Sequence, residues 1–142
     1  MKKFNLKNEI IERNAPEKPG IYHIYCFNRN HPIKIGRLLK ADEKGILSIG
    51  STKNLKRRLK QFVYGSIKHS GHSSGNRYGY LNLANKRKLG SYELKFSFEI
   101  KKKCEFRESE LLRGYMEKFG ELPPLNNREP LYDHLKILGY AE

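Results

Sequence analysis

The sequence of 142 residues has no long apolar run, few cysteines and few acidic residues. No apolar run approaches the roughly 20 residues that a membrane-spanning helix needs, and the N-terminus lacks the apolar segment of a signal peptide. Cys26 and Cys104 are too few and too far apart in the chain for a disulfide framework. We therefore expect a reduced, cytoplasmic protein without a membrane partner.

Acidic side chains are scarce relative to basic ones. Fifteen Asp and Glu residues face 29 Lys and Arg residues, so the formal net charge is +14. A small soluble domain usually carries a net charge of about 2–8, so solubility alone does not explain this surplus. Each phosphate that a basic side chain neutralises releases condensed counterions, which favours binding to nucleic acid. The composition therefore predicts a polyanionic partner.

Residue patterns divide the chain into the strands and helices of a single domain, residues 1–142. Runs of β-branched and aromatic residues predict strands, the first three forming an antiparallel meander, at 21–27, 33–39, 45–50 and 92–100. Helical periodicity and cap residues predict helices at 7–13, 54–62, 80–88, 105–119 and 131–140. A loop is expected where glycine and serine are frequent, at 65–79. We therefore predict an α+β fold, in which a small, mostly antiparallel sheet of three to four strands is flanked by helices.

The predicted helix 54–62 separates apolar and basic residues onto different faces. Leu55, Leu59 and Phe62 share one face at helical spacing. Arg58 lies at the edge of this apolar face, where its side chain is able to lean toward the sheet. The other basic side chains of this region are expected to bind nucleic acid; they are Lys53, Lys56, Arg57 and Lys60.

The predicted helix 105–119 places a carboxylate on its buried face. This face is formed by four apolar or aromatic residues, Leu111, Leu112, Tyr115 and Phe119. Glu108 falls at the centre of the face, whereas Glu110 lies about 160° from its middle and points to solvent. A buried carboxylate costs several kcal/mol unless a cation or hydrogen bonds compensate for it. Glu108 therefore needs a partner, either a metal ion or a structural ion pair with Arg58.

Three segments in chain order resemble the GIY-YIG nuclease family. The first is Pro19-Gly20-Ile21-Tyr22, which matches the family's PGIY opening. The second runs from Ser48 to Leu59 and contains Ile49-Gly50, followed by a Thr, a Leu and an Arg at the family spacing. The third is Glu108 with Leu111-Leu112, followed by Pro124-Leu125-Asn126. The resemblance covers about residues 19–127 and leaves 128–142 as a docking segment.

This resemblance implies a DNA endonuclease that hydrolyses phosphodiester bonds with Mg²⁺ or Mn²⁺. Carried over to this chain, the family scheme makes Tyr22 the general base and lets Arg58 hold the scissile phosphate. A phenol with a pKa near 10 needs nearby positive charge to act at neutral pH, and Arg58 is placed to supply it. Glu108 becomes the metal ligand, because a hard divalent ion prefers carboxylate oxygen and keeps several waters. Asn126 supports the site, with Asn127 as an alternative equivalent and a turn cap as an alternative role.

The chain departs from the family pattern at the second motif. Ser48 replaces the second family Tyr and follows Tyr22 by 26 positions, a longer interval than the family keeps. Lys34-Ile35-Gly36 lies near the usual interval, so Lys34 is expected to help lower the Tyr22 pKa. Phe62 stands where many members carry a His, which leaves two loop histidines as candidates for acid/base catalysis or phosphate contact, His69 and His72.

Three functional classes remain open at this point. The chain length favours a restriction-type enzyme, and because such members often act as oligomers, a homo-oligomer is expected. Ser48 favours a different class, a catalytically weakened nucleic-acid-binding module, whereas the retained Tyr22, Arg58 and Glu108 favour the enzyme. A basic RNA-associated protein without cleavage activity is the third class.

Overall fold

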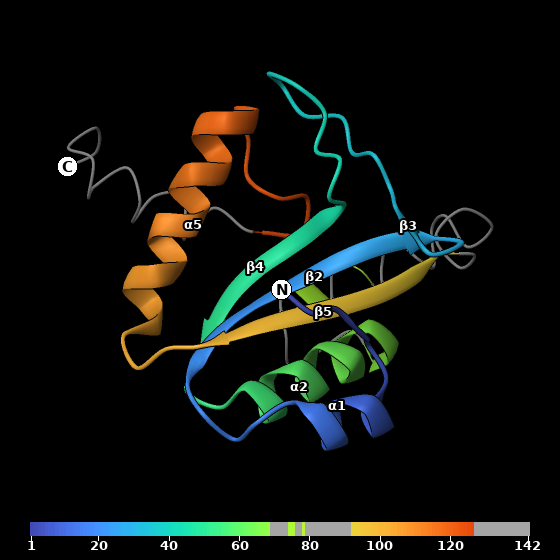
Figure 1. The fold of residues 1–142 in the computed structure, drawn as a ribbon, viewed down its shortest axis with the longest axis vertical. Helices are drawn as coiled ribbons and strands as arrows, with labels where there is room; N and C mark the ends of the chain where they lie inside the picture. The colour runs from blue at the N-terminus through green and yellow to red at the C-terminus, as the bar shows by residue number, and fades with distance from the viewer. Residues whose placement is uncertain (69–73, 76–77, 79–91, 127–142) are drawn as a thin grey trace.

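Strand β2 (Gly20–Asn28) is the centre of an antiparallel sheet (Figure 1). The computed structural model describes residues 1–68, 74–75, 78 and 92–126. Strand β5 (Glu93–Ile100) pairs with β2 along one side, and the short strand β1 (Phe4–Asn5) lies beyond β5. The sheet therefore brings the N-terminal residues next to a strand that lies about ninety positions later in the chain.

The other side of β2 is shared by two strands. Strand β4 (Ile46–Thr52) pairs with the first part of β2, and in this register Tyr22 lies opposite Gly50. Strand β3 (His31–Pro32) pairs with the last two residues of β2. In the described part of the chain, β4 has β2 as its strand partner on one side, so its outer edge faces other elements. This edge carries the polar groups considered below.

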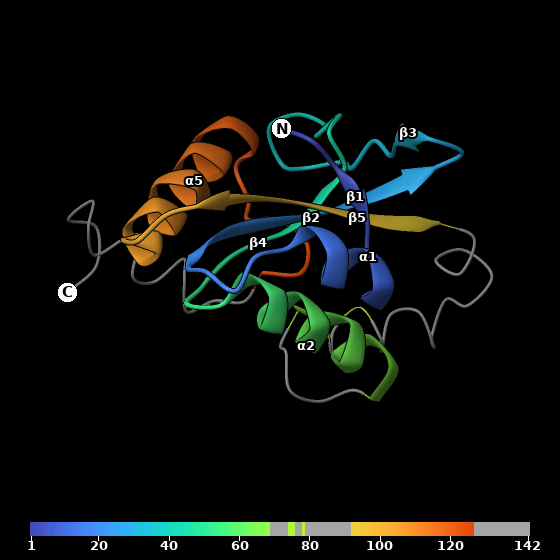
Figure 2. The same cartoon turned by 60° about the horizontal axis from the view of Figure 1, so that its bottom comes forward.

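Helices cover both faces of the sheet. Helices α1 (Asn8–Asn14) and α2 (Leu55–Lys68) lie on one face, and α5 (Cys104–Phe119) lies on the other (Figure 2). Side chains alternate along a strand, and because helices cover both faces of the sheet, the side chains of β2 are buried on both faces. Its residues in the two cores are Tyr22, Ile24 and Cys26 on the α2 side, and Ile21, Tyr25 and Phe27 on the α5 side. The predicted α+β fold is confirmed.

No helix in the described ranges combines the length and hydropathy that a membrane span requires.

Helix α2 begins where the sequence predicts and ends later. The Asn54 side chain accepts the backbone N–H of Arg57 at 3.0 Å and caps the helix. Leu55, Leu59 and Phe62 are fully buried, which confirms the predicted apolar face. The predicted end near residue 62 is wrong, because the helix continues to Lys68, and Val63 packs against the same core. The loop predicted for 65–79 therefore starts at least one turn later, and most of its remaining residues lie outside the described part.

The predicted strand 33–39 is wrong, and with it the meander 21–27, 33–39, 45–50. Regular pairing in this stretch stops at β3, and one isolated bridge joins Ile35 to Asp42. The buried Asp42 carboxylate accepts the backbone N–H of Lys44 at 2.8 Å and that of Ile46 at 3.2 Å. These bonds fold the stretch back on itself, so β4 pairs directly with β2 instead of with a third strand.

The last described elements close the outer edge of β4. Helix α5 ends at Gly120 in the left-handed region with φ 79°, as the sequence predicts. The chain then returns along β4, where the backbone N–H of Leu125 donates to the carbonyl of Leu47 at 2.8 Å. The helices predicted at 80–88 and 131–140 lie outside the described residues.

Candidate active site

Tyr22 packs directly over a glycine of the neighbouring strand. Its side chain is buried with 3% exposure, and Gly50 stands opposite it across the β2–β4 pair. A Cβ added to Gly50 would overlap the phenol, including its hydroxyl oxygen. The glycine of the second motif is therefore explained by steric space, since it provides room for the Tyr22 ring.

Arg58 reaches the phenol from α2. Its guanidinium is hydrogen-bonded to Tyr22, and its Nη1 also donates to Gln61 Oε1 at 3.0 Å. Burial raises the pKa of Tyr22 above its ordinary value, the Arg58 charge and hydrogen bond lower it, and the Glu108 charge raises it further. Burial outweighs the guanidinium, so the phenol is held in its protonated form at neutral pH.

Glu108 approaches the same end of β4 from the opposite face of the sheet. Its Oε2 accepts a hydrogen bond from the Ser51 hydroxyl at 2.6 Å. Gly50 faces Tyr22 and the next residue, Ser51, faces α5, so two consecutive residues of β4 connect the phenol with the carboxylate. The Glu108 charge acts on the phenol, which places both groups within one electrostatic site. Side chains from β2 and α2 on one face of the sheet and from α5 on the other thus border the same end of β4.

The helical-wheel argument for Glu108 is confirmed by the contacts of its neighbour. Glu110 is exposed and lies 3.7 Å from Arg107 Nη1 in an ion pair of the i, i+3 type. Glu108 is half-buried and faces β4 through Ser51. Its carboxylate is a hard oxygen donor, and the described residues hold no group of three or more His, Cys, Asp or Glu suited to a metal. This donor set fits a hard divalent ion that keeps most of its waters, and it does not fit a closed structural metal site.

Asn126 supports the site through the backbone of β4. Its Oδ1 accepts the N–H of Ile49 at 3.1 Å, and its Nδ2 donates to the carbonyl of the same residue at 2.8 Å. The side chain therefore binds β4 as a neighbouring strand would, immediately before Gly50 and Ser51. The side-chain bonds hold β4, while the backbone N–H of Asn126 donates to the Pro123 carbonyl at 3.1 Å within a turn. Asn127 lies outside the described residues.

Ser48 lies in the core. It is 1% exposed, and its hydroxyl is 3.0 Å from that of Ser74, which in turn donates to the carbonyl of Leu125 at 3.0 Å. A direct contact with substrate is therefore not available to Ser48. Ser48 instead helps to join β4 to the returning chain.

Lys34 does not reach Tyr22, because the strand predicted to carry it is not formed. Its exposed ammonium lies 3.9 Å from Glu43, and the residue lines a pocket on the α5 side of the sheet. The expectation that Lys34 lowers the Tyr22 pKa is wrong, since the charges acting there are those of Arg58 and Glu108. His69 and His72 lie outside the described residues.

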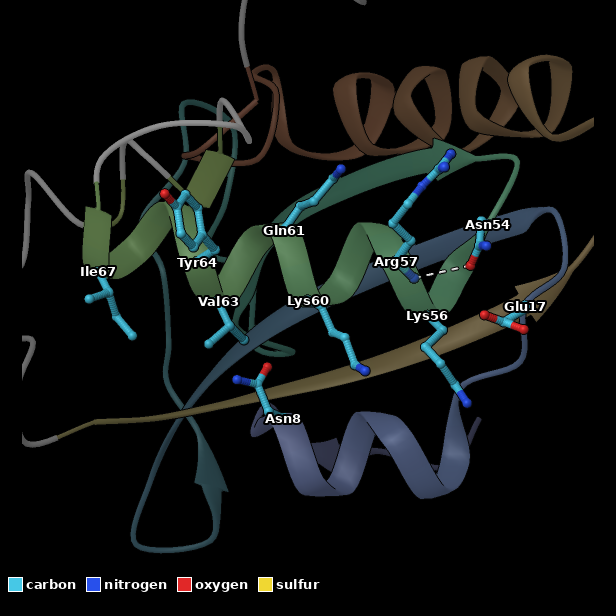
Figure 3. Close-up of a pocket in the computed structure, with 10 residues that line it drawn as sticks. All are labelled: Asn8, Glu17, Asn54, Lys56, Arg57, Lys60, Gln61, Val63, Tyr64 and Ile67. Atoms are coloured by element: carbon cyan, nitrogen blue, oxygen red, sulfur yellow. Dashed lines mark hydrogen bonds between the residues drawn. The ribbon is translucent and has the colours of Figure 1, made fainter.

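A groove beside the site runs along the outer side of α2. Figure 3 shows Arg57 and Gln61 on the side of α2 nearer β4, and Lys56 and Lys60 on the side nearer α1. Lys56 and Lys60 are both ion-paired with Glu12, so part of their charge is already neutralised. Arg57 is exposed and contributes its backbone N–H to the Asn54 cap, while Lys53 is exposed just before the helix. The predicted basic residues of this face therefore divide into two that form ion pairs within the protein, Lys56 and Lys60, and two that are exposed, Lys53 and Arg57.

Two residues of the site escaped prediction. Ser51 was not selected, although alternation along β4 puts it on the face opposite Gly50, where α5 packs. Gln61 was not selected either, although it stands three positions after Arg58 on α2 and accepts its hydrogen bond. Alternation along β4 and the helical spacing of α2 pointed to these two residues, but their use requires knowing which element packs against each of them.

Comparisons with protein-family models, with curated proteins and with solved structures find no match to this chain.

Proposed function

We propose that this protein is a metal-dependent endonuclease that hydrolyses phosphodiester bonds in DNA. The observation that supports the proposal is that Tyr22 and Arg58 are hydrogen-bonded at the end of β4 where Glu108 binds Ser51 from the other face, and that the Glu108 charge acts on the phenol. Hydrolysis of a phosphodiester needs a water molecule activated for attack, stabilisation of charge on the phosphoryl oxygens, and stabilisation of the departing oxygen. A phenol, a guanidinium and a carboxylate in one place offer groups suited to these tasks.

Arg58 is the group that holds the phosphate in the proposed reaction. Its planar guanidinium matches phosphate oxygens in a bidentate geometry, and its charge stabilises the transition state. The same guanidinium hydrogen-bonds to Tyr22 and to Gln61, so its position is fixed before substrate arrives. Tyr22 accepts the proton of the attacking water once its own proton has been lost, a loss that burial disfavours and Arg58 favours.

Glu108 is the residue that would hold Mg²⁺ or Mn²⁺. The Ser51 hydrogen bond at 2.6 Å orients the carboxylate, as bonds to metal ligands commonly do. A divalent ion bound there supplies positive charge to the phosphoryl oxygens. Glu108 itself contributes a fixed negative charge that raises the Tyr22 pKa, and a bound cation would oppose this effect.

DNA is proposed to lie along α2 and to reach Arg58 from the groove. Arg57 and Lys53 are exposed there, and Gln61 both lines the groove and contacts Arg58. The formal charge of +14 supports a polyanionic substrate. Lys56 and Lys60 contribute less than exposed lysines would, because Glu12 competes with phosphate for them.

The experiment that tests the proposal is the nicking of supercoiled plasmid DNA, with Mg²⁺ and with a chelator. We expect metal-dependent nicking that Glu108→Ala abolishes and that Glu110→Ala retains. The two residues lie on the same helix, but Glu110 is exposed and paired with Arg107, whereas Glu108 accepts the Ser51 hydroxyl of β4. Nicking that survives Glu108→Ala, or that is lost equally in both variants, contradicts the proposal.

A nucleic-acid-binding module with weakened catalysis is the second candidate. Two observations favour it: burial raises the Tyr22 pKa, and a buried Ser48 stands in place of a second phenol. This candidate predicts salt-sensitive DNA binding by the wild-type protein without nicking at any metal concentration. Tighter binding to RNA than to DNA, again without cleavage, would favour the RNA-associated class instead.

A further inference from the structure

A second pocket lies on the opposite face of the sheet from Tyr22, between α5 and the stretch that precedes β4. Helix α5 and this stretch lie on the same face of the sheet (Figure 2). Its inner wall is mostly apolar and is formed by Ile46, Ile49, Leu111 and Phe119. Gly114 of α5 also lines it, and a Cβ added at Gly114 meets no atom within 4 Å. The pocket is therefore an open cavity beside α5 with an apolar inner wall.

His23 is the polar group of the inner wall that lacks a partner. It is 8% exposed, and its Nδ1 is buried without a hydrogen bond to any described residue. The ring stacks on Tyr25 with centroids 5.9 Å apart and planes 13° apart. His23 therefore carries, beside the pocket, a hydrogen-bonding nitrogen that no described residue satisfies.

The imidazole is neutral in this setting. Burial lowers the pKa of His23 to about 4, and the charges of Arg107, Lys44 and Lys3 act in the same direction against that of Glu99. A neutral imidazole presents one N–H donor and one acceptor nitrogen. The wall therefore offers a neutral hydrogen-bonding nitrogen next to apolar surface, which suits a heteroaromatic ring better than a bare anion.

The rim of the pocket is basic. Four lysines line it, namely Lys34, Lys40, Lys44 and Lys118. The acidic residues beside them are already engaged: Asp42 accepts the Tyr115 hydroxyl and two backbone N–H groups, Glu43 pairs with Lys34, and Glu110 pairs with Arg107. Lys40, Lys44 and Lys118 make no ion pair with the described residues, so their charge is available to a phosphate.

We propose that this pocket binds a nucleotide, with the base against the apolar wall and His23, and the phosphate on the lysine rim. Apolar walls with a few convergent polar groups are typical of sites for small molecules. The inference goes beyond the proposed function and does not depend on it, because the pocket shares no residue with Tyr22, Arg58 and Glu108. The nucleotide is either free or an unpaired nucleotide of a DNA strand, and its chemistry is the same in both cases.

Calorimetric titration of the full chain with the four deoxynucleoside 5′-monophosphates tests the proposal. We expect at least one to bind about tenfold more tightly than its nucleoside, and more tightly than inorganic phosphate, because wall and rim act together. Gly114→Leu fills the open space and should weaken nucleotide binding by about tenfold or more, with the helix preserved because Leu is a better helix former than Gly.

Gly36→Leu is the matched control. A Cβ at Gly36 also meets no atom within 4 Å, and Gly36 does not line the pocket. His23→Phe retains a ring of similar shape without nitrogens, and it should reduce the preference among the four bases while the phosphate contribution persists. Equal binding by Gly114→Leu and Gly36→Leu on every probe overturns the proposal, as does equal affinity for nucleotide, nucleoside and inorganic phosphate.

A second probe distinguishes a free nucleotide from an unpaired nucleotide of a DNA strand. A duplex oligonucleotide with one mismatched base, which leaves the stack easily, is compared with its fully paired counterpart. Tighter binding of the mismatched duplex that is lost in Gly114→Leu, without binding of free monophosphates, assigns the pocket to a strand nucleotide. Binding of free monophosphates without this difference assigns it to a free nucleotide. Nicking is not a readout in either arm, so failure of the proposed function leaves the result unaffected.

Discussion

Buried polar groups on the two sides of β2 are stabilised in different ways. On the α5 side, the Asp42 carboxylate accepts the Tyr115 hydroxyl at 2.9 Å and the backbone N–H groups of Lys44 and Ile46. On the α2 side, the Tyr22 phenol lies between the opposing influences of Arg58, which lowers its pKa, and Glu108, which raises it. The first centre is saturated by neutral donors of the protein itself, and the second is composed of charges that act against each other.

This difference separates a structural centre from a candidate functional one. Three donors satisfy Asp42, so it fixes the stretch before β4 and needs no external partner. Tyr22, Arg58 and Glu108 bring two opposite charges and a disfavoured phenolate together at the end of an edge strand. Groups with perturbed pKa values that lie close together are typical of functional sites. Four pairs of substitutions test this difference and compare the two sides of the sheet.

The largest expected effect is on the rate of DNA nicking when one of two adjacent arginines is replaced. Arg58→Ala should lower the rate by about 1000-fold, because it removes the group that stabilises charge on the phosphate. Arg57→Ala should weaken DNA binding only a few-fold and reduce the slope of its salt dependence by about one, as expected for one lost phosphate contact. Nicking rates and salt titrations on both variants measure this contrast, and equal effects would show that Arg58 is an ordinary surface cation.

A large stability effect is expected at Asp42. Asp42→Ala leaves the Tyr115 hydroxyl and two backbone N–H groups without their acceptor, and it should lower the free energy of unfolding by about 3–5 kcal/mol. Tyr22→Phe retains the ring over Gly50 and should change stability by less than about 1 kcal/mol while it removes nicking. Chemical denaturation gives both values. A Tyr22→Phe variant as unstable as Asp42→Ala would make both centres structural.

The acid stability of the protein should depend on His23. Its pKa is lowered to about 4 in the folded protein from an ordinary value of 6.5, so the folded state binds the proton less well than the unfolded state. The contribution is therefore fully present above pH 6.5 and is lost as pH falls through about 4, which amounts to about 3 kcal/mol.

Denaturation series at several pH values measure this dependence. His23→Phe should flatten the stability curve between pH 6.5 and 4, whereas replacement of the exposed His31 by Gln should leave the curve as it is in the wild type. Identical acid limbs for the wild type and His23→Phe would rule out a neutral, buried imidazole at this position.

The smallest expected effects separate two glycines, one on each side of the sheet. Gly50→Ala introduces a Cβ into the Tyr22 phenol and should lower the free energy of unfolding by about 2 kcal/mol. Gly114→Ala places a Cβ in open space within α5 and should raise it by up to about 1 kcal/mol, because Ala is the better helix former. Thermal or chemical unfolding of the two variants decides the matter, and a neutral Gly50→Ala would remove the steric explanation for the motif glycine.

Local patterns predicted most of the described elements and the positions of Arg58 and Glu108 on their helices. Leu55, Leu59 and Phe62 defined the buried face of α2, and this face placed Arg58 at its edge. Helical spacing likewise distinguished Glu108 from the exposed Glu110. These predictions succeeded because periodicity is set by backbone geometry, which is the same wherever a helix packs.

Predictions failed where a distant residue decides the local conformation. The stretch 33–39 has the composition of a strand, but the hydrogen bonds of Asp42 fold it back and leave β4 to pair with β2. The same change carried Lys34 to the α5 side and left Ser48 in the core against Ser74. Alternation along a strand does not reveal which strand will be its neighbour, so these positions were not accessible from spacing alone.

By itself, the sequence determined the high positive charge, the α+β class and the residue types at the motif positions, because these follow from composition and short-range periodicity. The tertiary structure alone decided that Gly50 and Ser51 join the two faces of the sheet, and that the inner wall of a second pocket carries a His23 Nδ1 that no described residue hydrogen-bonds. The physical reason is that strand order and helix docking bring together side chains from distant parts of the chain, and burial then sets which of their charges are compensated.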